Sequence, residues 1–411
     1  MRKIKNIIVV LFVMSLLIIG CNKVGEDNMN NNKGNFNSEE KNDEVKENDI
    51  REKIESMSLD EKLGQLIIVG FEGTDINDNI SSFIKDLKVG GVIHFKRNIE
   101  SVEQVIELNN NIKELNKDSD IPLFVSIDEE GGDVSRLSQE YKDLPTANRL
   151  GQLDNEDVSF EYGELLGLRL KSLGFNLNYA PVMDINSNIN NPVIGDRAFG
   201  NNPELVSKHG LQVMKGIESK NIISSIKHFP GHGDTGVDSH VGLPEMNKSL
   251  EEIREFEFVP FKNAIEDDLD MVMVGHILFS EIDNEYPSTM SKKIITNILR
   301  DELGFTGVVI TDDLTMGAIT KNYTLEEATL KFLQAGGDIG LVCHGMDNPK
   351  KILDYLKDAV ENKELSMEDI DEKLYRILSL KEKYKLEDKA IVAPNMDDIN
   401  MKTQDLLEKI N

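Results

Sequence analysis

The sequence lacks tryptophan and contains only two cysteines, Cys21 and Cys343, among its 411 residues. Two cysteines cannot build a disulfide-stabilised scaffold or a four-cysteine zinc site. Basic residues are also scarce, because 46 Lys and Arg stand against 74 Asp and Glu, which gives a formal net charge of -28. A surface this acidic repels a phosphate backbone, so we expect no nucleic-acid partner. Hydrophobic residues make up 39% of the chain, which is enough to bury a sizeable core.

The N-terminal segment has the pattern of an export signal followed by a tether. Residues 1–20 combine a basic start with an apolar run that is too short for a comfortable membrane span. Cys21 follows directly in LLIIGC, which resembles a bacterial lipobox. We therefore expect signal cleavage, acylation of Cys21 with palmitate and a lipid anchor on the extracytoplasmic face of the cell membrane. An ordinary signal peptide with an incidental cysteine is the alternative. Residues 21–48 are too polar to form a core and are predicted to be a disordered tether.

Eight short apolar runs alternate with helical-length amphipathic stretches in the rest of the chain. These runs lie at residues 66–69, 91–95, 123–127, 175–182, 222–226, 271–274, 307–310 and 339–342. Ser58 and Glu61 have capping-box spacing and open the first helix, and Ser366 opens a helix that we expect to close the fold. The pattern predicts a single α/β domain, a (β/α)₈ TIM barrel over residues 49–386, with a C-terminal tail at 387–411. A doubly wound sheet is the alternative.

Most of the apolar runs end in polar or ionisable residues. These residues are His94, Asp128, Asp184, Lys227, His228, His276, Asp312, Cys343 and His344. The C-terminal ends of the strands of such a barrel form the active-site rim. Any one of these residues could be a solvated loop residue, but their shared position in so many units favours an active site.

The segment KHFPGHGDTGVDSH holds three of the seven histidines in the chain. We refer to residues 228–240 as the histidine loop, because three glycines and a proline predict a loop. In a structural interpretation its histidines cap helices and turns. In a second interpretation His228, His232, Asp238 and His240 bind a metal ion in a metal-activated hydrolase. In a third, Asp238 and His240 form an acid/base pair, because a carboxylate bonded to one imidazole nitrogen fixes the tautomer and raises the basicity of the ring.

Asp312 follows the apolar run at residues 307–310 in the sequence TDDLTM. It could be a helix cap or a solvated aspartate, although the neighbouring Asp313 could fill the capping position. A carboxylate at the end of a barrel strand is also what a glycosidase needs to stabilise or trap an oxocarbenium-like centre.

Six motifs in order resemble the family 3 glycoside hydrolases, in their bacterial β-N-acetylglucosaminidase (β-N-acetylhexosaminidase) branch. They are IDEEGGDVSRL, APVMDIN, NPVIGDRAFG, KHFPGHGDTGVDSHVGLP, GHILF and GVVITDDLTM. The resemblance covers roughly residues 50–386. It implies a retaining, exo-acting enzyme without metal or cofactor that removes terminal β-linked N-acetylglucosamine from cell-wall fragments during peptidoglycan turnover, or from related glycans.

The resemblance also implies roles for individual residues. Asp312 would be the nucleophile, His240 the proton donor and acceptor, and Asp238 the residue that orients His240. The terminal sugar would be held by Asp128, Arg136, Arg197, Lys227 and His228. Asp133 stands where the family commonly has an arginine, which reverses a charge near the expected sugar site.

Three rival functions follow from the same residues. A phosphorylase would use the same site and pass the sugar to phosphate. A metal-dependent hydrolase would use the histidine loop as its ligand set. A non-catalytic sugar-binding lipoprotein would need the cationic residues of the pocket but not Asp312 or His240.

Overall fold

The computed structural model describes residues 46–410. The predicted signal at residues 1–20, Cys21 and most of the predicted tether lie outside the described residues. The fold described below is that of the unit that begins at Asp49. Within residues 46–410, no helix is both long enough and apolar enough to cross a bilayer.

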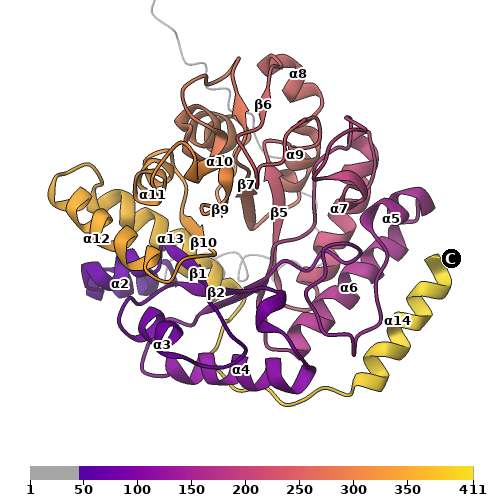
Figure 1. Cartoon of the computed structure of the whole chain (residues 1–411), viewed down its shortest axis with the longest axis horizontal. Coiled ribbons are helices and arrows are strands. Elements are labelled where there is room, and N and C mark those ends of the chain that lie inside the picture. The colour runs from indigo at the N-terminus through magenta and orange to yellow at the C-terminus, as the bar shows by residue number, and fades with distance from the viewer. Residues whose placement is uncertain (1–45, 411) are drawn as a thin grey trace, which may run out of the picture. The chain divides into compact units, whose positions relative to one another are not determined.

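Eight parallel strands form a closed barrel in the order β1-β10-β9-β7-β5-β4-β3-β2. The strands are β1 (Ile67–Gly70), β2 (Gly91–His94), β3 (Phe124–Ile127), β4 (Leu177–Asn178), β5 (Ile223–Phe229), β7 (Met271–Val274), β9 (Val308–Asp313) and β10 (Ile339–Val342). Each of them overlaps one of the eight predicted apolar runs. The strands lie at the centre with the helices around them (Figure 1), so the prediction of a (β/α)₈ barrel is confirmed and the doubly wound alternative is wrong.

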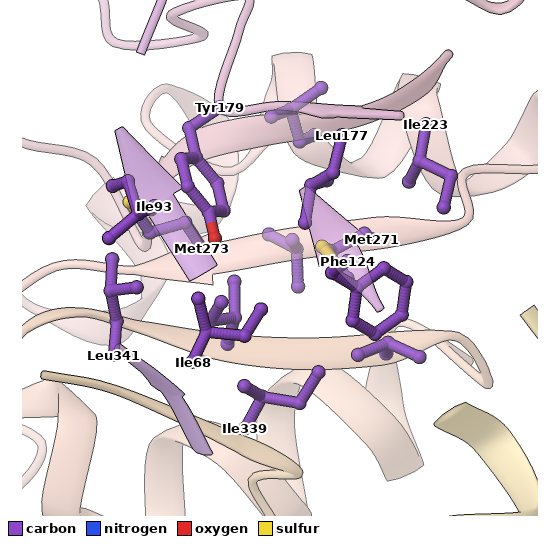
Figure 2. Packing of buried hydrophobic residues seen from close by; sticks show 14 of the residues in the cluster. Ile68, Ile93, Phe124, Leu177, Tyr179, Ile223, Met271, Met273, Ile339 and Leu341 are labelled. Carbon is purple, nitrogen blue, oxygen red and sulfur yellow. The ribbon is translucent and has the colours of Figure 1, made fainter. Parts of the chain in front are cut away.

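The inside of the barrel is filled with side chains. Figure 2 shows residues from different strands directed toward one another, among them Ile68, Phe124 and Met271, all of them fully buried. The polar end of Tyr179 is also inside, and its hydroxyl donates to Ser126 Oγ at 3.0 Å. A barrel of this size is therefore a packed core rather than a pore, and ligands are confined to its rim.

Helices follow the strands and cover the outside of the barrel. They are α2 (Leu59–Gly64), α3 (Asp78–Lys85), α4 (Val102–Leu115), α5 (Ala147–Leu153), α6 (Glu156–Ser172), α7 (Pro203–Glu218), α8 (Leu250–Glu255), α9 (Val259–Glu266), α10 (Gly317–Thr320), α11 (Leu325–Gln334), α12 (Asn348–Glu361), α13 (Met367–Lys383) and α14 (Met396–Ile410). Residues Lys293–Glu302 add a further helical segment. The predicted capping box is present, because Ser58 and Glu61 each accept from the other's backbone N–H. Ser366 caps α13 by accepting from the N–H of Asp369, as predicted.

Two elements were not expected from the sequence. The predicted tail contains α14, which packs against α6, and Arg169 Nη2 donates to Thr403 Oγ1 on α14 at 2.9 Å. A small parallel sheet pairs β6 (Glu245–Met246) with β8 (Leu278–Phe279). These strands have only two residues each, so they lack the length over which an alternating pattern can be read.

Candidate active site

The closed barrel brings the predicted site residues to one rim. Asp128 directly follows β3, Lys227 and His228 lie in β5, and Asp312 lies in β9. All eight strands are parallel, so their C-terminal ends point to the same side. The rim therefore collects side chains that are far apart in the sequence.

Asp312 is a partly buried carboxylate near the end of β9. The N–H of Asp313 donates to Asp312 Oδ1 at 2.8 Å. Burial alone would raise the pKa of the Asp312 carboxyl, but the imidazoles of His228 and His276 outweigh that effect. With the Asp313 N–H and the Lys227 ammonium they lower the pKa to about 2. The carboxylate is therefore ionised at neutral pH, which is the form that a nucleophile or an electrostatic stabiliser requires.

Four charged residues form a network beside Asp312. Lys227 Nζ lies 2.6 Å from Asp128 Oδ1 and 2.8 Å from Glu130 Oε1. Arg197 grips the same Glu130 with two bonds, Nε to Oε2 at 2.9 Å and Nη2 to Oε1 at 2.7 Å. Burial would raise the pKa of Glu130, but the charges of Arg197 and Lys227 hold it far below its ordinary value. This network fixes both cations at the rim of the barrel, and their contacts with a sugar stay a prediction.

Glu130 belongs to the charged network at the rim, although the sequence did not single it out. It stands in the motif DEEGGD, where three acidic residues in a row gave no reason to single it out. Its importance depends on pairing with Arg197 and Lys227, which come from other parts of the chain. A buried carboxylate between two cations is recognisable only once those cations are placed.

Asp184 holds the start of the histidine loop. Its Oδ2 lies 2.6 Å from His228 Nδ1, and its Oδ1 accepts from the N–H of His232 at 2.6 Å. Burial would raise the pKa of Asp184, but these two residues lower it below its ordinary value. His232 is itself buried, and burial together with the charge of His228 lowers its pKa to about 4. His232 is therefore neutral at neutral pH and serves as part of the loop's framework.

Asp238 and His240, the predicted acid/base pair, are hydrogen-bonded to each other. His240 Nδ1 lies 2.8 Å from Asp238 Oδ1, and the His240 N–H donates to the same oxygen at 2.8 Å. Burial raises the pKa of Asp238, but both of these bonds outweigh that effect and lower it. The His240 side chain is 67% exposed. A carboxylate accepts only, so Nδ1 carries a proton and Nε2 is left to exchange protons with a ligand.

Arg136, a predicted sugar-binding residue, has a buried side-chain nitrogen without a partner among the described residues. Its backbone N–H donates to Glu129 Oε2 at 2.7 Å. Its Nε is buried and has no hydrogen-bond partner among residues 46–410. A buried donor without a partner costs free energy unless a ligand or water satisfies it, which fits the predicted contact with a sugar oxygen. Asp133, the departure from the family pattern, is exposed.

The candidate metal ligands of the histidine loop are engaged within the protein. His228 Nδ1 lies against Asp184, and His232 uses Nδ1 for Thr235 Oγ1 at 2.7 Å and Nε2 for Ser239 Oγ at 3.1 Å. In the part of the chain that the structure describes, no three His, Cys, Asp or Glu side chains are grouped so that they could hold a metal ion.

A parallel barrel with an ionised carboxylate at a strand end and a histidine–aspartate pair on a rim loop defines a TIM-barrel enzyme equipped for glycosyl transfer. Residues 58–380 match the model of the glycosyl hydrolase family 3 N-terminal domain. The chain therefore belongs to the family 3 glycoside hydrolases, enzymes that act on O-glycosyl bonds, and the resemblance seen in the motifs is confirmed.

Similar proteins agree with this assignment. Beta-hexosaminidase A of Pseudoalteromonas piscicida is 36% identical over 334 residues, which cover 75% of this chain and 56% of that protein. The chain thus spans little more than half the length of this relative. A family 3 β-N-acetylglucosaminidase from Paenibacillus sp. has 37% identity and a TM-score of 0.81, covering 86% of this chain and 69% of that one. NagZ of Neisseria gonorrhoeae has 28% identity and a TM-score of 0.69, covering 84% of this chain and 98% of that one.

Proposed function

We propose that this protein is an exo-acting, retaining β-N-acetylglucosaminidase. The observation that carries the proposal is the pairing of an ionised Asp312 with the Asp238–His240 dyad at the rim of one barrel. The similar proteins named above, which are β-hexosaminidases and β-N-acetylglucosaminidases, support the choice of sugar.

The proposed reaction has two displacements. In the first, an Asp312 carboxylate oxygen forms a bond to the anomeric carbon while the glycosidic C–O bond breaks, and His240 Nε2–H gives its proton to the leaving oxygen. In the second, His240 takes a proton from water, the water oxygen bonds to the anomeric carbon, and the Asp312 ester bond breaks. A histidine–aspartate dyad thus replaces the second carboxylate of the usual pair.

Residues at the rim supply donors and acceptors for a neutral sugar. Arg136 offers an unsatisfied buried Nε, and Asp128 is positioned by Lys227 to accept from hydroxyls. Roles for Arg197 and His228 toward the sugar follow from the family resemblance and belong to the proposal.

The central assignment is tested by trapping. An activated 2-fluoro glycoside should glycosylate the enzyme once, because the fluorine slows both displacements while the activated leaving group keeps formation of the glycosyl-enzyme faster than its hydrolysis. Peptide mapping should place the label on Asp312. A label on any other residue would refute the assignment.

The same experiment series separates the rival functions. Turnover of an aryl β-N-acetylglucosaminide with and without phosphate distinguishes hydrolysis from phosphorolysis, because a phosphorylase releases sugar 1-phosphate as its main product. Loss of activity on exhaustive chelation, with recovery in zinc, would favour a metal-dependent hydrolase. Unchanged function of Asp312→Ala in the cell would favour a sugar-binding lipoprotein.

We further propose that the enzyme acts outside the cytoplasm, on cell-wall fragments, from a lipid anchor at Cys21. The lipobox-like sequence LLIIGC and the polar residues 21–48 support this location. Incorporation of labelled palmitate into the wild-type chain, and its loss in Cys21→Ser, would bear it out. Labelling that persists in Cys21→Ser would overturn it.

A further inference from the structure

The C-terminal end of the histidine loop contacts the helix that follows β9, the strand of the proposed nucleophile. The N–H of Ala318 donates to Ser239 O at 3.0 Å, and the N–H of Gly317 donates to His240 O at 3.3 Å. Both donors belong to α10, which begins five residues after Asp312. The backbone of the proposed acid/base is thus bound to the helix that follows the strand of the proposed nucleophile.

The imidazole of His240 is held only locally. The partner of its ring among the described residues is Asp238, which stands in the same loop. The base of the loop is fixed by a different element. Asn191 Nδ2 donates to His232 O at 2.8 Å and to Gly233 O at 3.1 Å. Between this base and the contact with α10, no hydrogen bond ties residues 236 and 237 to another element in the described part of the chain.

Gly317 allows the loop to approach this closely. A Cβ at position 317 would lie 2.6 Å from His240 O and 3.1 Å from Val241 O. Real Cβ atoms are not found that close to a backbone oxygen, so either the loop or α10 must shift. Gly317 is the first residue of a helix, where alanine is otherwise favoured over glycine. The close approach of the loop is the reason for glycine at this position.

We propose that Gly317 is a positioning residue for the proposed acid/base, and that the start of α10 is the docking surface that sets His240 relative to Asp312. The proposal rests on the proposed function for its catalytic consequence. Proton transfer requires the donor within hydrogen-bond reach of the leaving oxygen. A displacement of about 1 Å can cost about 10²-fold in rate, so the docking contact controls the acid/base step.

Two alanine variants test this proposal. Gly317→Ala places a methyl group against the loop, whereas Gly236→Ala in the same loop places one where no heavy atom lies within 4 Å. The variants should be compared with the wild type on aryl β-N-acetylglucosaminides whose leaving groups differ in acidity. We expect Gly317→Ala to lose about 10–100-fold in kcat/KM with the least acidic leaving group and much less with the most acidic one. Gly236→Ala should follow the wild type.

Amide hydrogen exchange measures the contact between the loop and α10 directly and needs no substrate. The amide of Ala318 should exchange faster in Gly317→Ala than in the wild type, because the clash weakens its bond to Ser239 O, and Gly236→Ala should leave it protected. An equal loss with all leaving groups, or exchange at Ala318 that does not change in Gly317→Ala, would overturn the proposal. If the wild type turns over no β-N-acetylglucosaminide, the proposed function fails, and the exchange result still decides whether the loop docks on α10.

Discussion

His276 Nε2 hydrogen-bonds to the carbonyl oxygen of Asp313 at 2.9 Å. A carbonyl oxygen only accepts, so Nε2 carries the proton, and Nδ1 accepts from Thr289 Oγ1 at 3.0 Å. Burial lowers the pKa of His276 below its ordinary value. His276, which follows the neighbouring strand β7, thus holds the carbonyl group of Asp313, the residue next to the proposed nucleophile Asp312.

Asp312→Asn should lower kcat by roughly 10⁴-fold or more, because the amide cannot form the glycosyl-enzyme. The substitution preserves size, so the unfolding midpoint should change little. Steady-state turnover and a thermal unfolding curve check both expectations. Retention of a tenth of the wild-type turnover would exclude Asp312 as the nucleophile.

His240→Ala should hurt substrates with poor leaving groups most. General acid catalysis contributes about 10²–10⁴-fold, and it matters least when the leaving group is already acidic. Asp238→Asn should show the same trend more weakly, because the ring loses the acceptor that fixes its tautomer. Rates on activated and unactivated aryl glycosides measure the difference. Equal losses on both would count against His240 as the acid.

Glu130→Gln should raise KM by about 10-fold and destabilise the fold by about 3 kcal/mol, because it leaves Arg197 and Lys227 beside a neutral group in a buried site. Asp196→Asn is the matched control. It also removes one negative charge next to Arg197, but Asp196 is exposed. The control should keep the wild-type KM and unfolding midpoint. If Glu130→Gln behaves like the control, the network does not position the two cations.

Lys381 should make stability depend on pH. Its ammonium is buried against Gln65 Oε1 and Pro122 O at 2.8 and 2.7 Å, and burial lowers its pKa to about 7. In the unfolded chain the lysine keeps its ordinary, higher pKa. Burying the charged form therefore lowers the free energy of unfolding, and this loss of stability is fully present below pH 7. It fades as the pH rises toward the ordinary lysine value of about 10.4.

The variant Lys381→Met removes this titration. The difference in unfolding midpoint between Lys381→Met and the wild type should shift in favour of the wild type as the pH rises from about 7 to about 10. Thermal unfolding at a series of pH values measures it. A difference that is constant over this range would contradict a depressed pKa at Lys381.

The sequence alone predicted the barrel and the contact between Asp238 and His240. Each strand is a short apolar run, and the caps at Ser58 and Ser366 are local hydrogen bonds within one turn, so both leave a signature in neighbouring residues. The position of Asp312 at a strand end and the two-residue spacing of Asp238 and His240 are equally local. The prediction of a dyad could therefore be made, and its geometry is as expected.

The contacts between distant segments, including the ion pairs of the rim, depend on the tertiary structure. Glu130 pairs with Arg197 and Lys227, and the loop tip at His240 rests on Gly317, because barrel closure brings β3, β5 and β9 to one rim. No pattern in neighbouring residues encodes these contacts. They join segments that are distant in the chain, and their strength depends on burial, which the sequence does not contain until the barrel closes.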